Sequence, residues 1–108
     1  MEDPSNWNVL IVDDEPDNIG VLELVFGFHN MKVRTAQSGQ AGLVLLREEI
    51  PTFILVDIQM PDMTGYELFN RIRENPDWAT VPVIAITAHT MSGDAEKILE
   101  AGFNGYIA

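Results

Sequence analysis

The fold is decided by the stretch NVLIVDDEP, residues 8–16. After Asn8 its first residues are apolar without interruption, which is typical of a strand that is covered on both faces. Asp13 and Asp14 end this strand, and Pro16 suits the first turn of a helix. A buried strand that ends in carboxylates and leads into a helix predicts the first half of a βαβ unit.

The same alternation continues along the chain. The opening helix is expected over residues 17–28, with Ile19, Leu22 and Phe26 on one face. Five strands that alternate with four helices predict an α/β fold, in which a doubly wound parallel sheet carries helices on both faces. The expected strands are residues 8–12, 32–36, 52–56 and 81–86, and a fifth from Gly105. The later helices are expected over residues 38–49, from Thr64, and over 92–101.

Helix-capping signals support these boundaries. Ser38 is a typical N-cap, and Thr64 with Glu67 has the spacing of a capping box. Gly102 follows the last expected helix, where a glycine commonly ends the helical conformation.

Size, composition and charge limit the classes of function. The 108 residues, with a 46% hydrophobic content, fit one soluble globular domain over 1–108. Six basic against seventeen acidic residues give a net charge of -11, which repels nucleic-acid phosphates. No apolar run has the length of a membrane span, and the absence of cysteine fits a reducing cytoplasm. We therefore expect a cytoplasmic protein that binds neither nucleic acid nor membrane.

Carboxylates gather at the expected strand ends. The first strand ends in Asp13 and Asp14, the third in Asp57, and the fourth in Thr87. An isolated aspartate after a strand is more often a helix cap than a nucleophile. Two acidic strand ends in this order are harder to explain as caps, and they indicate a functional site at the edge of the sheet. If the first and third strands are neighbours, the three carboxylates converge, and Mg²⁺ would relieve their repulsion. Asp57 could then act as a nucleophile that forms an aspartyl phosphate.

Four separated segments resemble the receiver domains of response regulators in two-component signalling. They occur in the family's order and spacing and cover nearly the whole chain. The resemblance implies a flavodoxin-like sheet with strand order 2-1-3-4-5. The segments are residues 9–16, 55–65, 81–88 and 101–108.

The resemblance also assigns the acidic site. It implies that Asp57 is the phosphoacceptor and that Asp13 and Asp14 hold Mg²⁺. The backbone carbonyl of Gln59 would complete the protein's share of the metal ligands. A sensor histidine kinase or a histidine phosphotransfer protein would supply the phosphoryl group, and a downstream effector protein or output domain would read it.

Further positions are implied to report or tune phosphorylation. Thr87 corresponds to the switch hydroxyl and Tyr106 to the switch aromatic, which act on the surface around the fourth helix and fifth strand. Gln59 and His89 stand at variable positions that tune the lifetime of the phosphoryl group. Ala88 is small, as access to the site requires.

The chain departs from the family pattern near its C-terminal residue. The lysine that follows the switch aromatic is absent, and Lys32 and Lys97 do not lie where the phosphoryl group would form. The last helix of the family is also absent. Its loss is expected to expose apolar surface of the first and fifth strands and to favour a homo-oligomer through the open face. A truncated sequence explains both departures equally well.

Three other classes of protein share parts of this pattern. A flavodoxin-like nucleotide binder would need a Ser, Thr or Gly-rich loop where residues 13–17 are acidic. An aspartate-nucleophile phosphohydrolase would need a second carboxylate at position 59, which is Gln59 here. A receiver-like interaction module that takes no phosphate stays open because of the absent lysine.

Overall fold

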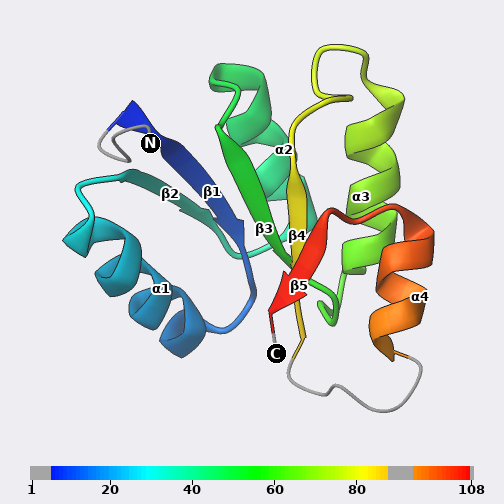
Figure 1. Cartoon of the computed structure of the whole chain (residues 1–108), viewed down its shortest axis with the longest axis horizontal. Coiled ribbons are helices and arrows are strands. Elements are labelled where there is room, and N and C mark those ends of the chain that lie inside the picture. Colours follow the sequence, from blue (N-terminus) through cyan, green and yellow to red (C-terminus); the bar gives the residue numbers. More distant parts are fainter. Residues whose placement is uncertain (1–5, 88–93, 108) are drawn as a thin grey trace.

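The computed structural model describes residues 6–87 and 94–107, which form an alternating series of strands and helices (Figure 1). The strands are β1 (Asn8–Val12), β2 (Lys32–Ala36), β3 (Phe53–Asp57), β4 (Val83–Ile86) and β5 (Gly105–Ile107). The helices are α1 (Pro16–Phe28), α2 (Gly39–Glu48), α3 (Gly65–Glu74) and α4 (Asp94–Ala101). No helix among the described residues is both long and apolar enough to cross a bilayer.

The five strands form one sheet in the order β2-β1-β3-β4-β5, and every neighbouring pair is parallel. The predicted doubly wound fold and its strand order are therefore confirmed. Val12 at the end of β1 pairs with Val56, the residue before Asp57. This register brings the carboxyl ends of β1 and β3 to the same edge of the sheet, where ligand sites of such folds lie.

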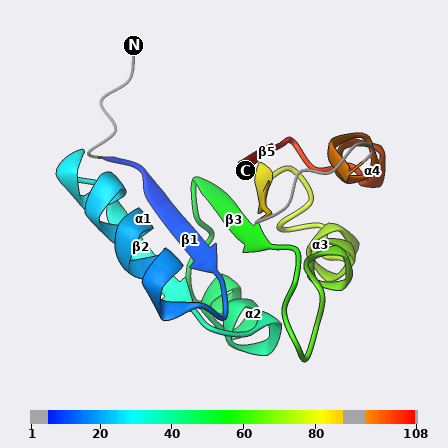
Figure 2. The same ribbon diagram turned by 90° about the horizontal axis from the view of Figure 1, so that it is seen from below.

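The sheet separates two apolar clusters because successive strand residues point to opposite faces. Leu10 and Val12 pack in the larger cluster with side chains from α2, α3 and α4. Val9 and Ile11 pack in the smaller cluster with Ile19 of α1. Figure 2 shows α1 well separated from α2 and α3, which lie across the sheet from it. Leu22 and Phe26 also pack against the smaller cluster, which confirms the predicted inner face of α1.

The caps predicted from the sequence are present. The Ser38 hydroxyl accepts a hydrogen bond from the backbone N–H of Ala41, and Thr64 and Glu67 form a reciprocal capping box. Gly102 ends α4 with a φ of 110°, a left-handed conformation that favours glycine. These local bonds satisfy backbone groups that the helix itself leaves without partners.

Most elements begin or end within one residue of the prediction, and two of the differences have a clear physical reason. Asp57 belongs to β3 rather than following it, because it pairs with Ile86 and the next N–H, that of Ile58, donates to the Ile86 carbonyl. Strand β4 begins at Val83, after Pro82, which has no N–H to contribute to the sheet. The predicted start of the fourth helix at Ser92 lies outside the described residues.

The predicted exposure of the first strand is wrong. All of Val9–Val12 is buried, because α1 covers the face of β1 that the prediction left open. The prediction for the fifth strand is confirmed, since Tyr106 and Ile107 are 40% and 42% exposed. Further exposed apolar side chains lie on the outer side of α1. This outer stripe consists of Val21, Leu24, Val25 and Phe28, between 49% and 83% exposed.

Candidate functional site

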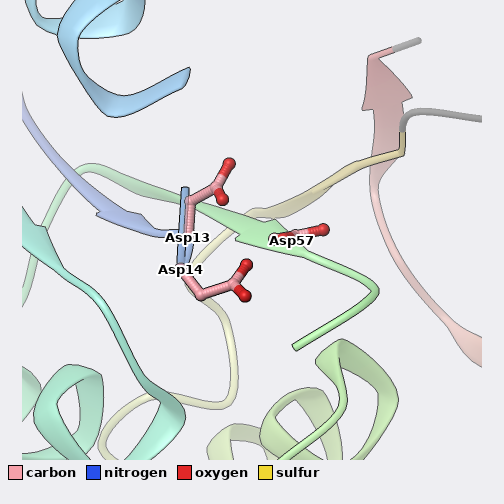
Figure 3. Close-up of side chains that lie close together, drawn as sticks. All are labelled: Asp13, Asp14 and Asp57. Carbon is pink, nitrogen blue, oxygen red and sulfur yellow. The ribbon is translucent and has the colours of Figure 1, made fainter. Parts of the chain in front are cut away.

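Three carboxylates converge where β1 and β3 end. Asp13 and Asp14 directly follow β1, and Asp57 is the last residue of β3 (Figure 3). One oxygen from each lies within 4.8 Å of the others. The predicted convergence of these three residues is therefore confirmed.

Asp13 is fully buried and is held by its neighbours in the chain. Its Oδ1 accepts a hydrogen bond of 2.9 Å from the backbone N–H of Glu15. Its Oδ2 accepts one of 3.3 Å from the side-chain amide of Asn18, in the first turns of α1. The connection between β1 and α1 thus holds the carboxylate of Asp13, the most deeply buried of the three, in a fixed position.

Asp57 is half-buried and has an unusually high proton affinity. The pKa of Asp57 is raised from 3.8 to about 7, and burial is the largest cause. A hydrogen bond from the Gln59 N–H lowers the pKa, while the charge of Asp13 and contacts with both neighbouring aspartates contribute to the rise. The Gln59 N–H donates to Asp57 Oδ1 over 3.0 Å. Repulsion within the cluster therefore favours either a proton or a cation at this position.

A cavity of about 430 Å³ opens over the cluster. Asp14, Asp57, Gln59 and Thr87 all line this acidic cavity, so the structure brings these four predicted site residues together. The backbone N–H of Thr87 donates to the carbonyl of Ile107 over 3.0 Å, which joins this wall of the cavity to β5. Tyr106 lies on β5, is 40% exposed and is not among the residues that line the cavity.

Sequence reasoning missed two residues that shape the site. The side-chain amide of Asn18 donates a hydrogen bond to the Asp13 carboxylate. The sequence indicates this role only through the position of Asn18 in the first turn of the helix that follows the strand. Gly65 begins α3, where a Cβ atom would lie 2.6 Å from the Asp57 carbonyl oxygen and 2.8 Å from Ile58 Cα. The absence of a side chain at Gly65 therefore lets α3 start directly against the strand that carries Asp57.

The donor set fits a magnesium ion. The three carboxylates offer hard oxygen ligands, and their spacing of up to 4.8 Å is close to that needed in an octahedral shell. Oxygens of such a shell lie about 3–4 Å apart, so a small inward movement of the side chains would complete it. Half-burial of Asp14 and Asp57 leaves room for further ligands from solvent or from a phosphate.

A parallel α/β sheet with three aspartates at the carboxyl ends of the neighbouring strands β1 and β3 is the arrangement that the resemblance to receiver domains implied. The model of the response regulator receiver domain matches residues 9–108, and the chain belongs to this family. Receiver domains are signalling modules of two-component systems rather than metabolic enzymes, and they generally bind Mg²⁺.

Individual relatives agree with this assignment. The response regulator DivK of Brucella ovis is 34% identical over 101 residues, which are 94% of this chain and 82% of DivK. The histidine kinase BarA of Escherichia coli K12 is 37% identical over 100 residues, which are 93% of this chain but only 11% of BarA. The receiver domain of the Pseudomonas aeruginosa kinase PA1611, solved with magnesium in its active-site cleft, superposes with a TM-score of 0.85. That domain is 31% identical to the chain, and the match covers 94% of this chain and 84% of the domain.

The remaining predicted positions have different outcomes. Ala88 and His89 lie outside the described residues. Lys32 pairs with Glu49 over 2.7 Å, and Lys97 is not among the residues that line the acidic cavity. Neither lysine is therefore among the described residues that line the acidic cavity.

Proposed function

We propose that Asp57 accepts a phosphoryl group in a two-component relay and that Mg²⁺ is bound by Asp13, Asp14, Asp57 and the backbone carbonyl of Gln59. The observation that carries this proposal is the position of Asp57, within 4.8 Å of the other two carboxylates and open to a cavity. Bound Mg²⁺ supplies a positive charge that offsets the repulsion between Asp57 and the phosphate oxygens.

Phosphoryl transfer requires the protein mainly to position the reacting groups and to offset their negative charge. A carboxylate oxygen of Asp57 attacks the phosphorus of a phosphohistidine on a histidine kinase or a histidine phosphotransfer protein. The P–N bond breaks, its electron pair stays on the imidazole, and an acyl phosphate forms on Asp57. Water in the same cavity later hydrolyses that acyl phosphate. The transfer and the dephosphorylation are thus the domain's own chemistry, although it turns over no metabolic substrate. The proposal also implies a cytoplasmic location, because kinases that supply the phosphoryl group use ATP.

Thr87 and Tyr106 are proposed to report the phosphorylated state. The Thr87 hydroxyl would donate to a phosphoryl oxygen, as a charge-assisted hydrogen bond favours. Its backbone is bonded to Ile107, the neighbour of Tyr106, so movement of Thr87 would act on β5 directly. The resulting shift between two populations would change the surface of α4 and β5, to which an effector protein or output domain would bind.

The homo-oligomer predicted from the sequence stays a prediction. The apolar surface available to it consists of Tyr106, Ile107 and the outer stripe of α1. Sedimentation velocity at increasing protein concentration tests it, and a species that stays monomeric throughout would contradict it.

Incubation with Mg²⁺ and a small acyl phosphate or phosphoramidate tests the phosphoacceptor. Intact-mass spectrometry should show one added phosphoryl group on the wild type and none on Asp57→Ala. The exposed aspartate Asp62 provides the matched control, because Asp62→Ala leaves the cluster unchanged. Equal phosphorylation of Asp57→Ala would contradict the assignment. No phosphorylation of the wild type would favour the interaction module that takes no phosphate.

A further inference from the structure

A second cavity lies beside the acidic one and has a different chemical character. It encloses about 560 Å³ between the β3–α3 loop and α4, a volume within the range of small-molecule sites. Gln59 and Thr87 line both cavities and so form a common wall. None of the described residues that line this second cavity is acidic, although the chain carries seventeen acidic residues.

The ammonium group of Lys97 indicates that a ligand of this cavity would carry a negative charge. Lys97 of α4 lines the second cavity, and its ammonium group lies 5.5 Å from the centroid of the Tyr66 ring. Among the side chains that the structure describes, the one ion pair is formed by Lys32 and Glu49, so no carboxylate there neutralises Lys97. A cation that forms no ion pair with the described carboxylates can pair with an anionic group of a ligand.

Aromatic contacts hold this cation in place. The Tyr66 ring meets Phe103 edge to face at 5.9 Å, and Phe103 in turn stacks on Phe69 at 4.4 Å. Lys97 therefore rests on a ring that the core fixes, which reduces the ordering needed when a ligand binds.

One part of the cavity wall is suited to a flat apolar group. Met60 and Ile98 line it and are 6% and 1% exposed, and Pro61 adds a rigid apolar surface. Gln59, Thr64 and Thr87 line another part of the wall with polar groups. Apolar walls with a few polar groups and one charge are the usual composition of a site that orients a small ligand.

We infer that this second cavity binds a small aromatic carboxylate, with the carboxylate paired to Lys97 and the ring lying against Met60, Pro61 and Ile98. The cavity adjoins the phosphoacceptor site and shares Gln59 and Thr87 with it, but Asp13, Asp14 and Asp57 do not line it. The inference therefore does not depend on phosphorylation of Asp57.

The test compares 1-naphthylacetate with 1-naphthylacetamide, which has the same ring system and no charge. Methyl NMR follows Met60 and Ile98 in the cavity, with Ile19 on the opposite face of the sheet as an internal reference. We expect saturable shifts of the cavity methyl groups with a Kd of about 1 mM for the carboxylate, typical of a ligand of this size. The amide should bind about tenfold more weakly, because it cannot pair with Lys97.

Variants separate recognition by Lys97 from general binding. Lys97→Met should remove the preference for the carboxylate, Lys97→Arg should retain it, and Lys32→Met should leave it unchanged. Three results would overturn the inference. They are equal affinities for acid and amide, a preference that survives in Lys97→Met, and an absence of saturable shifts at Met60 and Ile98 in the wild type.

Discussion

Replacing Asp57 by asparagine is expected to stabilise the fold at neutral pH. In the folded protein the pKa of Asp57 is raised from 3.8 to about 7, first by burial and then by its acidic neighbours. When the pKa of a carboxyl group is higher in the folded than in the unfolded protein, the group makes its full contribution to the free energy of unfolding at pH values below the unfolded-state pKa. That contribution is lost as the pH rises through the folded pKa. Asp57→Asn keeps the size of the side chain and an oxygen for the Gln59 N–H, but removes the charge.

The size of the effect follows from the shift. A difference of about three pKa units corresponds to an upper limit of roughly 4 kcal/mol in the free energy of unfolding. Asp57 is only half-buried, so solvent screens part of its repulsion. We therefore expect Asp57→Asn to be more stable than wild type by about 2 kcal/mol at about pH 8. The difference should shrink by about 1–2 kcal/mol on going down to about pH 5.

Urea unfolding without divalent cations measures this difference, with the fluorescence of the buried Trp78 as one signal of unfolding. The other carboxylates are present in both wild type and Asp57→Asn, so the difference between their free energies of unfolding reports on Asp57. Asp62→Asn, in the exposed β3–α3 loop, should show no such trend, and added Mg²⁺ should reduce the advantage of Asp57→Asn. A stability difference that is constant from about pH 5 to pH 8 would refute the reasoning.

Four further predictions concern stability and the metal. Gly65→Ala should lower the free energy of unfolding by about 2 kcal/mol in urea titrations, because its Cβ would meet backbone atoms at 2.6 and 2.8 Å. Gly20→Ala, with nothing within 4 Å, should instead raise it by about 0.5–1 kcal/mol. Thr64→Ala should cost about 1 kcal/mol in the same assay through loss of the capping box. Asp13→Asn should weaken Mg²⁺ binding at least about tenfold by calorimetry, and unchanged affinity would exclude Asp13 from the site.

The fold was predictable because its signals are local. The uninterrupted apolar residues of β1 and β3, and the caps at Ser38 and Thr64, act within a few residues of the chain. The end of β3 was placed one residue early, since a charged residue such as Asp57 interrupts an apolar pattern. Its backbone nevertheless continues the hydrogen bonds of the sheet, as pairing with Ile86 shows.

The convergence of Asp13, Asp14 and Asp57 was predictable for a similar reason, because parallel strands bring their carboxyl ends to one edge. Asn18 and Gly65 were not predictable, since their roles depend on distances between separate elements. The exposure of the first strand was predicted wrongly, because the absence of the family's last helix does not reveal how much of the strand α1 covers. In the structure Val9 and Ile11 are buried against Ile19 of α1 and against side chains of the neighbouring strands.

The outer stripe of α1 has a consequence for how the protein behaves at different ionic strengths. Val21, Leu24, Val25 and Phe28 follow one another at helical spacing, so they present one apolar ridge. In dilute buffer the net charge of -11 opposes the approach of two molecules. At about 1 M salt the Debye length falls to roughly 3 Å, and the repulsion no longer reaches between them. Sulfate also strengthens apolar attraction, so the protein should be retained strongly on a hydrophobic-interaction column loaded in ammonium sulfate.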